Sequence, residues 1–253
     1  MPQHKVAVIT GGSGQLGSAI SRALANRGVQ IVSIVRKDLD KAQAILDSLA
    51  NQELGHIAIL ASVTDSKSLK EAAEVVNLKI GRCDILINNA GRNRTRPKSL
   101  EEMTDDSIDD IIDTNVKGPI LTTREFLTLL NNSTDPIIIN MSSASATSPR
   151  RANPLYASSK GAVNTLTKSL AYFLAPKIRV IAISPSILPL PVSGIDEPHK
   201  FPTPKHQEDW IKNNIPLQKI ITAEEVAEAV EHVVFGMRQM TGNVLPVDGG
   251  VTI

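Results

Sequence analysis

The sequence predicts an α/β protein with a doubly wound parallel sheet flanked by helices. Short apolar segments alternate with segments of helical periodicity along most of the chain, which is typical of a parallel sheet covered on both faces. A glycine-rich turn follows the first of these apolar segments. With 253 residues, 42% of them hydrophobic, the chain suffices for a single domain spanning 1–253.

Seven apolar segments of four or five residues are predicted to be the strands. Most are rich in valine and isoleucine, which suit the buried strands of a parallel sheet. They cover 6–10, 31–35, 57–60, 85–88, 137–141, 180–184 and 244–247.

The segments between the strands carry apolar residues at helical spacing. Leu16, Ile20 and Leu24 mark the first helix, which is predicted to end at Gly28. Further helices are expected at 41–49, through 69–76, from about 105 to 130, and onward from Tyr156. The stretch 186–216 is rich in proline and polar residues and follows a strand, so we expect an irregular loop that covers a substrate.

Composition excludes several classes of function. A formal net charge of +1 gives no basis for attraction to nucleic acid or to a membrane surface. No apolar run approaches the ~18 residues of a membrane span, and no leader precedes the first strand. The single cysteine, Cys83, leaves no disulfide and no thiol cluster for a metal, and is expected to be buried. We therefore expect a cytoplasmic protein without a metal, nucleic-acid or membrane partner.

The glycine-rich turn predicts a dinucleotide site of the Rossmann type. Gly12, Gly14 and Gly17 satisfy the pattern G-x-G-x-x-G between the first strand and the first helix. Such glycines permit a tight turn and let a pyrophosphate approach the positive end of the helix. The predicted contacts in this turn are Gly11, Ser13, Gly14, Gln15 and Leu16.

The residues after the second strand bear on the choice of cofactor. An acidic side chain there binds the ribose hydroxyls of NAD, whereas arginine suits the 2′-phosphate of NADP. The chain has Arg36 and Lys37 at this place, with the first acid at Asp38. We therefore favour NADP, and NAD remains the alternative, in which both basic residues are ordinary solvated charges.

Tyr156 and Lys160 are four residues apart, so they lie on one face of the helix expected there. A phenol normally titrates near pH ~10, and a neighbouring ammonium lowers that pKa and makes tyrosine usable as an acid or base. Ser143, which follows an apolar strand, could hydrogen-bond the oxygen of a carbonyl or alcohol. Together the three residues predict an acid–base site.

The motifs follow one another in the order of the glycine-rich turn, Asn88-Asn89-Ala90-Gly91, Asn115, Ser143, Tyr156 with Lys160, Pro185 and Val247-Asp248-Gly249-Gly250. On these motifs the chain resembles the compact single-domain branch of the short-chain dehydrogenase/reductases (SDR) over essentially its whole length. The resemblance implies an NAD(P)-dependent oxidoreductase that transfers a hydride between a nicotinamide cofactor and a carbonyl or alcohol substrate.

The resemblance also implies a role for each matching residue. Tyr156 is the general acid in reduction and the base in oxidation, and Lys160 lowers its pKa and holds the nicotinamide ribose. Ser143 orients the reacting oxygen, and Asn115 anchors a water-linked proton route. The remaining cofactor contacts implied are Ser62, Val63, Asn89, Ala90, Gly91, Pro185 and Ile187.

The chain departs from the family pattern at three places. Gln15 stands where the family usually has a turn glycine, and Ser62 stands where an aspartate commonly lies near the adenine. Where many members have Pro-Gly and a following threonine for the pyrophosphate, this chain has Pro185-Ser186 and then Leu188, Pro189 and Leu190. The four catalytic residues that the resemblance implies, Asn115, Ser143, Tyr156 and Lys160, are all present.

The substrate and the assembly stay open. Basic residues that are expected near the pocket, and that could attract an anionic substrate, are Arg92, Arg94, Arg96, Lys98, Arg150 and Arg151. The alternative is ordinary surface charge. Other interpretations are an NAD-dependent alcohol dehydrogenase and a non-catalytic nucleotide-sensing protein. The resemblance implies a homotetramer or homodimer assembled through two long helices, about 105–130 and 156–175.

Overall fold

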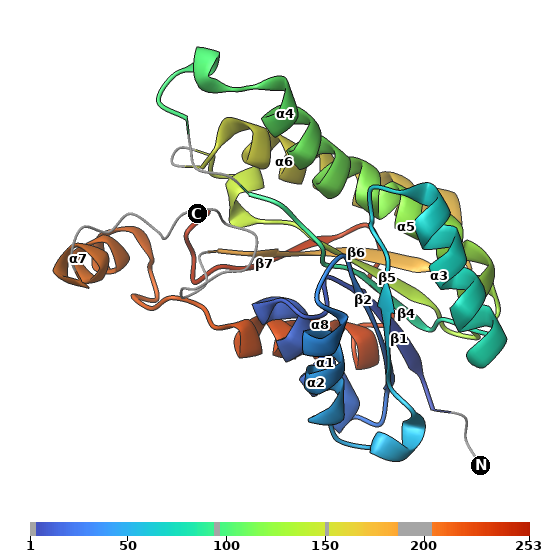
Figure 1. Cartoon of the computed structure of the whole chain (residues 1–253). Helices are drawn as coiled ribbons and strands as arrows, with labels where there is room; N and C mark the ends of the chain where they lie inside the picture. Colours follow the sequence, from blue (N-terminus) through green and yellow to red (C-terminus); the bar gives the residue numbers. More distant parts are fainter. Residues whose placement is uncertain (1–3, 94–96, 150–151, 187–203) are drawn as a thin grey trace.

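The computed structural model describes residues 4–93, 97–149, 152–186 and 204–253. These residues form a parallel sheet of seven strands in the order β3-β2-β1-β4-β5-β6-β7 (Figure 1). The strands are β1 (Val6–Thr10), β2 (Gln30–Val35), β3 (Ile57–Leu60), β4 (Ile85–Asn88), β5 (Ile137–Met141), β6 (Arg179–Pro185) and β7 (Val244–Val247). Each of the seven predicted strands is confirmed, as is the doubly wound fold.

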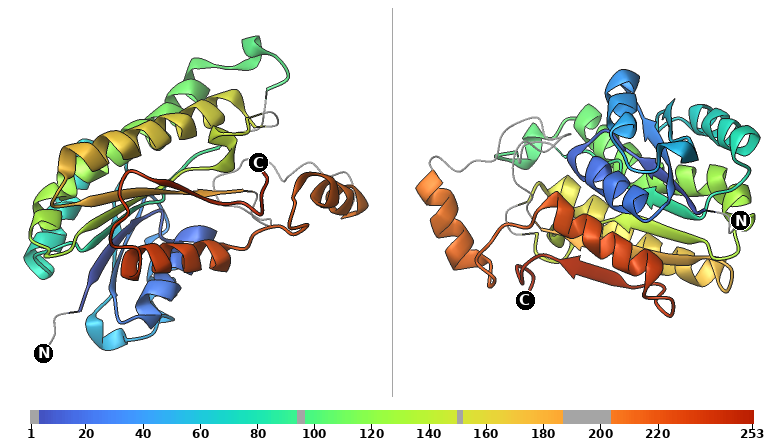
Figure 2. Two further views of the ribbon diagram at one scale, coloured as in Figure 1. Left: turned by 180° about the vertical axis from the view of Figure 1, so that it is seen from behind. Right: turned by 90° about the horizontal axis from the view of Figure 1, so that it is seen from below.

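Helices cover both faces of the sheet, as the views from two further directions show (Figure 2). One face carries α1 (Gln15–Asn26), α2 (Leu39–Asp47) and α8 (Ala223–Phe235). The other face carries α3 (Ser66–Lys79), α5 (Gly118–Asn131) and α6 (Pro154–Leu174). Alternate residues of one strand serve opposite faces: Ile9 packs under α1, whereas Val8 packs under α5. Both faces are buried, which is why the strands are continuously apolar.

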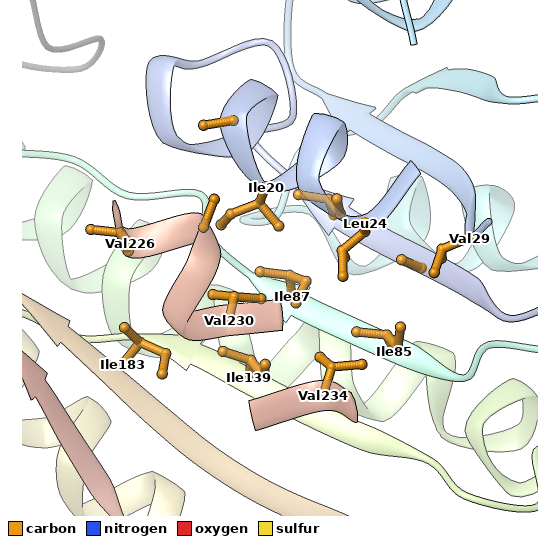
Figure 3. Close-up of a cluster of buried hydrophobic side chains, with 14 of the residues drawn as sticks. Ile20, Leu24, Val29, Ile85, Ile87, Ile139, Ile183, Val226, Val230 and Val234 are labelled. Carbon is orange, nitrogen blue, oxygen red and sulfur yellow. The ribbon is translucent and has the colours of Figure 1, made fainter. Parts of the chain in front are cut away.

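The core beneath α1 and α8 joins residues from distant parts of the chain. Ile20 and Leu24 of α1 meet Val230 of α8 above Ile87 of β4 (Figure 3). These side chains are fully buried. The first helix after the glycine-rich turn therefore depends on the last helix of the chain for part of its cover.

Three helical features differ from the sequence-based expectation. The expected helix at 105–130 consists of α4 (Asp105–Ile112), a π-helical turn (Asp113–Lys117) and α5. The second part of the expected irregular stretch 186–216 is a helix, α7 (Pro204–Asn214), so the prediction of an irregular loop is wrong there. The helix α8 was not predicted at all. Short 3₁₀ turns lie at Gln52–Leu54, Leu100–Glu102 and Ala144–Ala146.

Asp84 joins several segments at the amino ends of the strands. Its carboxylate accepts hydrogen bonds from Val6 N at 2.7 Å and Ser133 Oγ at 2.6 Å, and it pairs with Arg82 Nε at 3.2 Å. Next to it, Cys83 is fully buried, and burial raises the pKa of its thiol, as expected of an unreactive cysteine. The contacts of Asp84 and the burial of Cys83 give this edge of the sheet a stabilising role.

The opposite edge, at the carboxyl ends of the strands, is where the candidate functional site lies. The order of the strands reverses between β1 and β4, because β2 and β3 lie on one side and β5 to β7 on the other. Ligands of open α/β sheets bind at such a switch point.

Among the described residues no helix is long and apolar enough to cross a membrane.

Candidate active site

The glycine-rich turn connects β1 to α1 and leaves almost no room for side chains at its glycine positions. Gly11 has a φ of +66°, which favours glycine. A Cβ atom at Gly12 would lie 2.1 Å from Ser33 Oγ, and one at Gly17 would lie 2.4 Å from Gly11 O. Larger residues at these positions would push the turn away from β2, so the glycines hold α1 against the sheet.

The start of α1 suits an anionic group. Gly14 is the N-cap, where glycine offers no side chain to the first N–H groups, and in the described structure the first turn carries no acidic residue. Unpaired N–H groups at a helix start attract phosphate. Ser13, Gly14 and Gln15 are partly exposed here, whereas Leu16 packs against the core beneath α1. The start of α1 therefore has the features of a phosphate cradle, and the contacts of these four residues with a pyrophosphate stay a prediction.

The segment after β4 is tied to the turn by Thr10. Its Oγ1 accepts hydrogen bonds from Asn89 N and Ala90 N, both at 3.0 Å. The Asn89 side chain donates to Thr10 O at 2.9 Å and to Gly11 O at 3.2 Å. The predicted residues Asn89 and Ala90 therefore lie beside Gly11, and Thr10, which sequence reasoning missed, positions them.

A small hollow opens at this switch point. Its walls are formed by Thr10, Val63, Asn88, Ala90, Thr114, Gly118, Pro119 and Thr122. Two predicted cofactor residues, Val63 and Ala90, are thus brought together. Ser62 is engaged locally, since its N–H donates to Ser68 Oγ at 3.1 Å and its hydroxyl lies 3.0 Å from that of Thr64.

Arg36 and Lys37 are exposed directly after β2. The next residue, Asp38, adopts a left-handed conformation with φ 58° and caps α2 by accepting a hydrogen bond from Lys41 N at 3.0 Å. The nearest acidic side chain is thus occupied by the helix cap. The two basic side chains stand at the place where a ribose or its phosphate would meet the second strand.

Tyr156 and Lys160 lie on successive turns at the start of α6, as predicted. Asn153 caps this helix by accepting a hydrogen bond from Leu155 N at 2.9 Å, and Pro154 begins it. The Lys160 Nζ donates to Met141 O at the end of β5 at 2.7 Å, and lies 5.7 Å from the centre of the Tyr156 ring. Ser143, two residues beyond β5, lies close enough to Tyr156 to lower the pKa of its phenol. The three residues of the predicted acid–base site are therefore brought together.

The electrostatics of this site differ from the expectation. Burial raises the pKa of Tyr156, and the nearby Ser143 side chain offsets only part of this rise. Burial also lowers the pKa of Lys160 to about 8. Loss of solvent around the phenol dominates, so the lowered pKa expected for Tyr156 is not found, and the influence of Lys160 on the phenol stays a prediction. Tyr156 is consequently protonated at neutral pH, in the form that donates a proton.

Asn115 lies in the π-helical turn and is fully buried. Its Oδ1 accepts from Arg92 N at 2.7 Å, while its Nδ2 donates to Arg92 O and to Ser159 Oγ, both at 2.9 Å. Ser159 in turn donates to Tyr156 O at 2.7 Å. Sequence reasoning missed Ser159, although its place directly before Lys160 on the catalytic helix was a usable signal.

The segment after β4 also reaches Lys160. A Cβ atom at Gly91 would lie 3.6 Å from Asn115 Oδ1 and 3.7 Å from Lys160 Nζ. Gly91, Asn115 and Lys160 therefore meet at one point. Pro185, by contrast, ends β6 as a buried residue paired with Val247.

Several predicted residues lie outside the described part of the chain, namely Ile187, Arg94, Arg96, Arg150 and Arg151. Of the basic rim, Arg92 and Lys98 are described. The Arg92 guanidinium pairs with Asp110, with Nε 3.1 Å from Oδ2. Asp248, in the last of the family motifs, accepts hydrogen bonds from Gly250 N at 2.8 Å and Thr252 Oγ1 at 2.6 Å.

Known proteins resemble this chain in sequence and in structure. The family described as short chain dehydrogenase matches residues 5–193. An uncharacterized oxidoreductase of Staphylococcus saprophyticus is 33% identical over 193 residues, which is 76% of this chain and 82% of that protein. A 3-oxoacyl-[acyl-carrier-protein] reductase of Bos taurus is 30% identical, with 98% of each chain covered. The crystal structure of a 3-ketoacyl-(acyl-carrier-protein) reductase from Brucella melitensis, complexed with NADH, superposes with a TM-score of 0.87 at 29% identity over 100% of both chains.

Proposed function

The chain belongs to the short chain dehydrogenase family of oxidoreductases, and from this premise we propose that it reduces a ketone with a nicotinamide cofactor, NADP being favoured. Tyr156 serves as the general acid and base. The observation that carries the proposal is the grouping of Tyr156, Ser143 and Lys160 at the same sheet edge as the glycine-rich turn, with Lys160 Nζ 5.7 Å from the centre of the Tyr156 ring.

The bound nicotinamide supplies the hydride for the carbonyl carbon. Ser143 orients the carbonyl oxygen by a hydrogen bond, and Tyr156 gives that oxygen the proton that completes the alcohol. The raised pKa of Tyr156 keeps this proton in place at neutral pH until the oxygen gains charge. Lys160 supplies positive charge beside the phenol, and Asn115 fixes the wall next to it.

The direction of the reaction is part of the proposal. Alcohol oxidation needs Tyr156 as a phenolate, and burial disfavours that ion. Ketone reduction needs the neutral phenol. The site therefore supports reduction at neutral pH better than the alternative of an NAD-dependent alcohol dehydrogenase.

The preference for NADP rests on Arg36 and Lys37. Both are exposed after β2, and Asp38, the acid that could bind ribose hydroxyls, is occupied in capping α2. An arginine fork matches a phosphate in geometry as well as in charge.

The substrate is a small-molecule ketone, and a 3-oxoacyl compound is the first to try because two of the similar proteins bear that activity in their names. The hypothesis of an anionic substrate loses one of its supports, because Arg92 pairs with Asp110. It now depends on Lys98 and on residues outside the described structure.

The test is calorimetric titration with NADPH and NADH, followed by a screen of 3-oxoacyl and other ketones for NADPH oxidation. Binding of NADPH that is at least tenfold tighter than that of NADH, together with turnover of a ketone, supports the proposal. Tighter NADH binding with alcohol oxidation favours the dehydrogenase alternative. Binding of neither cofactor rejects the proposed function and favours a non-enzymatic role.

A further inference from the structure

Arg92 contacts the catalytic region through its backbone and through its side chain. Its N–H and C=O both bind the side chain of Asn115, at 2.7 and 2.9 Å. Its guanidinium Nε lies 3.4 and 3.1 Å from the two carboxylate oxygens of Asp110. One residue therefore holds both Asn115 and the helix that leads into Asn115.

These contacts close a ring. The ring runs from the Arg92 backbone to Asn115, back along the π-helical turn to Asp110 in α4, and through the ion pair to the Arg92 side chain. A π-helical turn lacks the regular hydrogen bonds that fix an α-helix, and such turns occur mostly at functional sites. The ring supplies the external support that this turn needs.

The ion pair between Arg92 and Asp110 is largely shielded from solvent. The side chains of Arg92 and Asp110 are 23% and 20% exposed. Pairs this shielded are screened by salt less than surface pairs are, and one guanidinium N–H shared by both carboxylate oxygens restricts the geometry. By comparison, Lys117 and Asp113 in the same π-helical turn form a pair at 3.4 Å whose side chains are 51% and 44% exposed.

The ring touches the catalytic lysine. Gly91 precedes Arg92, and a Cβ there would lie 3.7 Å from Lys160 Nζ. The second donor bond of Asn115 goes to Ser159, the neighbour of Lys160 on α6. A shift of Arg92 must therefore move the wall against which Lys160 packs.

We propose that Arg92 and Asp110 are positioning residues. Their ion pair holds Asn115 and the adjoining wall of the active site in place against Lys160, and so keeps Lys160 in position beside Tyr156. The proposal rests on the proposed function for its kinetic consequence. In this proposal Arg92 does not contact the substrate. Loss of its side chain is therefore expected to slow the reduction of neutral and acidic ketones equally.

The test compares Arg92→Met, Asp110→Asn and the double variant with the wild-type protein. Misplacement of catalytic groups by about 1 Å costs up to ~100-fold in rate, so we expect kcat for a neutral ketone to fall by ~10- to 100-fold. We expect KM to change by less than about threefold, which distinguishes positioning from binding. The double variant is expected to be no slower than Arg92→Met, because both changes break the same pair.

The matched controls are Lys117→Met and Asp113→Asn, which break the exposed pair in the same turn and are expected to keep the wild-type kcat. Thermal melting checks that each variant is folded. Asp110→Asn, which keeps the size of the side chain, tests the proposal where Arg92→Met does not fold.

A second readout does not depend on turnover. In protein labelled with ¹³Cε-lysine, the Lys160 signal is assigned by its absence in Lys160→Met and titrated by NMR. Burial lowers the pKa of Lys160 to about 8, and a displaced wall admits water, so Arg92→Met is expected to raise that pKa toward the ordinary lysine value. The control variants are expected to leave it unchanged.

Unchanged kcat and an unchanged Lys160 titration in Arg92→Met would overturn the proposal. So would a KM that rises for acidic ketones alone, since Arg92 would then contact substrate. A wild-type protein that reduces no ketone defeats the proposed function instead, and the Lys160 titration still decides on the positioning pair.

Discussion

The protonation state of Tyr156 sets the chemistry of the site at the scale of single residues. Removing the hydroxyl with Tyr156→Phe takes away the proton donor and leaves the ring in place. We expect kcat for ketone reduction to fall by ~10²- to 10⁴-fold, the contribution of a positioned general acid. The affinity for NADPH, measured by calorimetry, is expected to stay within about threefold. Substantial residual turnover would place the proton donor elsewhere.

Lys160 gives the reduction a predicted pH dependence. Its pKa is lowered to about 8 by burial, so it loses its positive charge as the pH rises through that value, while Tyr156 with its raised pKa stays protonated. We expect the rate of ketone reduction to fall as the pH rises through about 8. A rate profile that is flat between pH 7 and 9.5 would contradict this.

The same pKa shift has a consequence for stability. A lysine whose pKa is lower in the folded state than in the unfolded state opposes folding below both values, and this cost disappears as the pH rises from the folded to the unfolded pKa. Lys160→Met is therefore expected to melt at a higher temperature than the wild type at pH 7, and the difference is expected to shrink toward pH 10. Calorimetric melting at the two pH values measures it.

Arg36 tests the choice of cofactor at a single position. Arg36→Asp removes a guanidinium and introduces a charge that repels a phosphate. We expect the ratio of NADPH to NADH affinity to fall by at least tenfold, as measured by titration with both cofactors. The control is Arg22→Asp on α1, where the wild-type arginine is half-exposed and pairs with Glu224 at 3.8 Å. An unchanged ratio in Arg36→Asp would count against NADP.

At the scale of elements, Asp84 holds the amino edge of the sheet together through β1, Arg82 and Ser133. Asp84→Ala leaves the Arg82 guanidinium and two buried donors without this partner. We expect a loss of ~2–4 kcal/mol in the free energy of unfolding, measured by urea denaturation. Glu224→Ala, which breaks an exposed pair with Arg22, is expected to cost less than about 0.5 kcal/mol. A loss below ~1 kcal/mol for Asp84→Ala would contradict the structural role.

The strands were predictable because they are buried on both faces, so each appears as a short continuous apolar run. The helix α8 was predictable too, and was missed. Thr222 and Glu225 form a capping box before Val226 and Val230, which are buried at helical spacing. The helix α7 gave little signal, because its sequence is polar around Trp210.

The π-helical turn could not be predicted from local sequence. It exists because Asn115 is bound by Arg92 and Ser159, which lie 23 and 44 residues away along the chain. For the same reason, the motif placed Asn115 in the site but gave no sign of its ion-paired support by Arg92 and Asp110. The raised pKa of Tyr156 likewise depends on burial, which a spacing of four residues does not report.

At the scale of the whole molecule, the two long helical segments expected to form a subunit interface carry exposed apolar side chains. Tyr172 and Phe173 on α6 are 90% and 80% exposed, and Ile120 on α5 is 44% exposed. We expect a homodimer or homotetramer that buries them. Phe173→Glu is expected to shift the protein toward smaller species by at least tenfold in dissociation constant, as measured by sedimentation. A wild-type protein that is monomeric at micromolar concentration would contradict the expectation.

The packing of α1 against α8 also affects how the chain folds on the ribosome. The apolar stripe of α1, with Ile20 and Leu24, emerges early, whereas its cover from Val230 and Val234 is synthesised about 200 residues later. For most of translation, this part of α1 therefore lacks the cover that Val230 and Val234 give it in the folded protein. We therefore expect this apolar stripe to stay open to chaperone binding on the ribosome until α8 emerges.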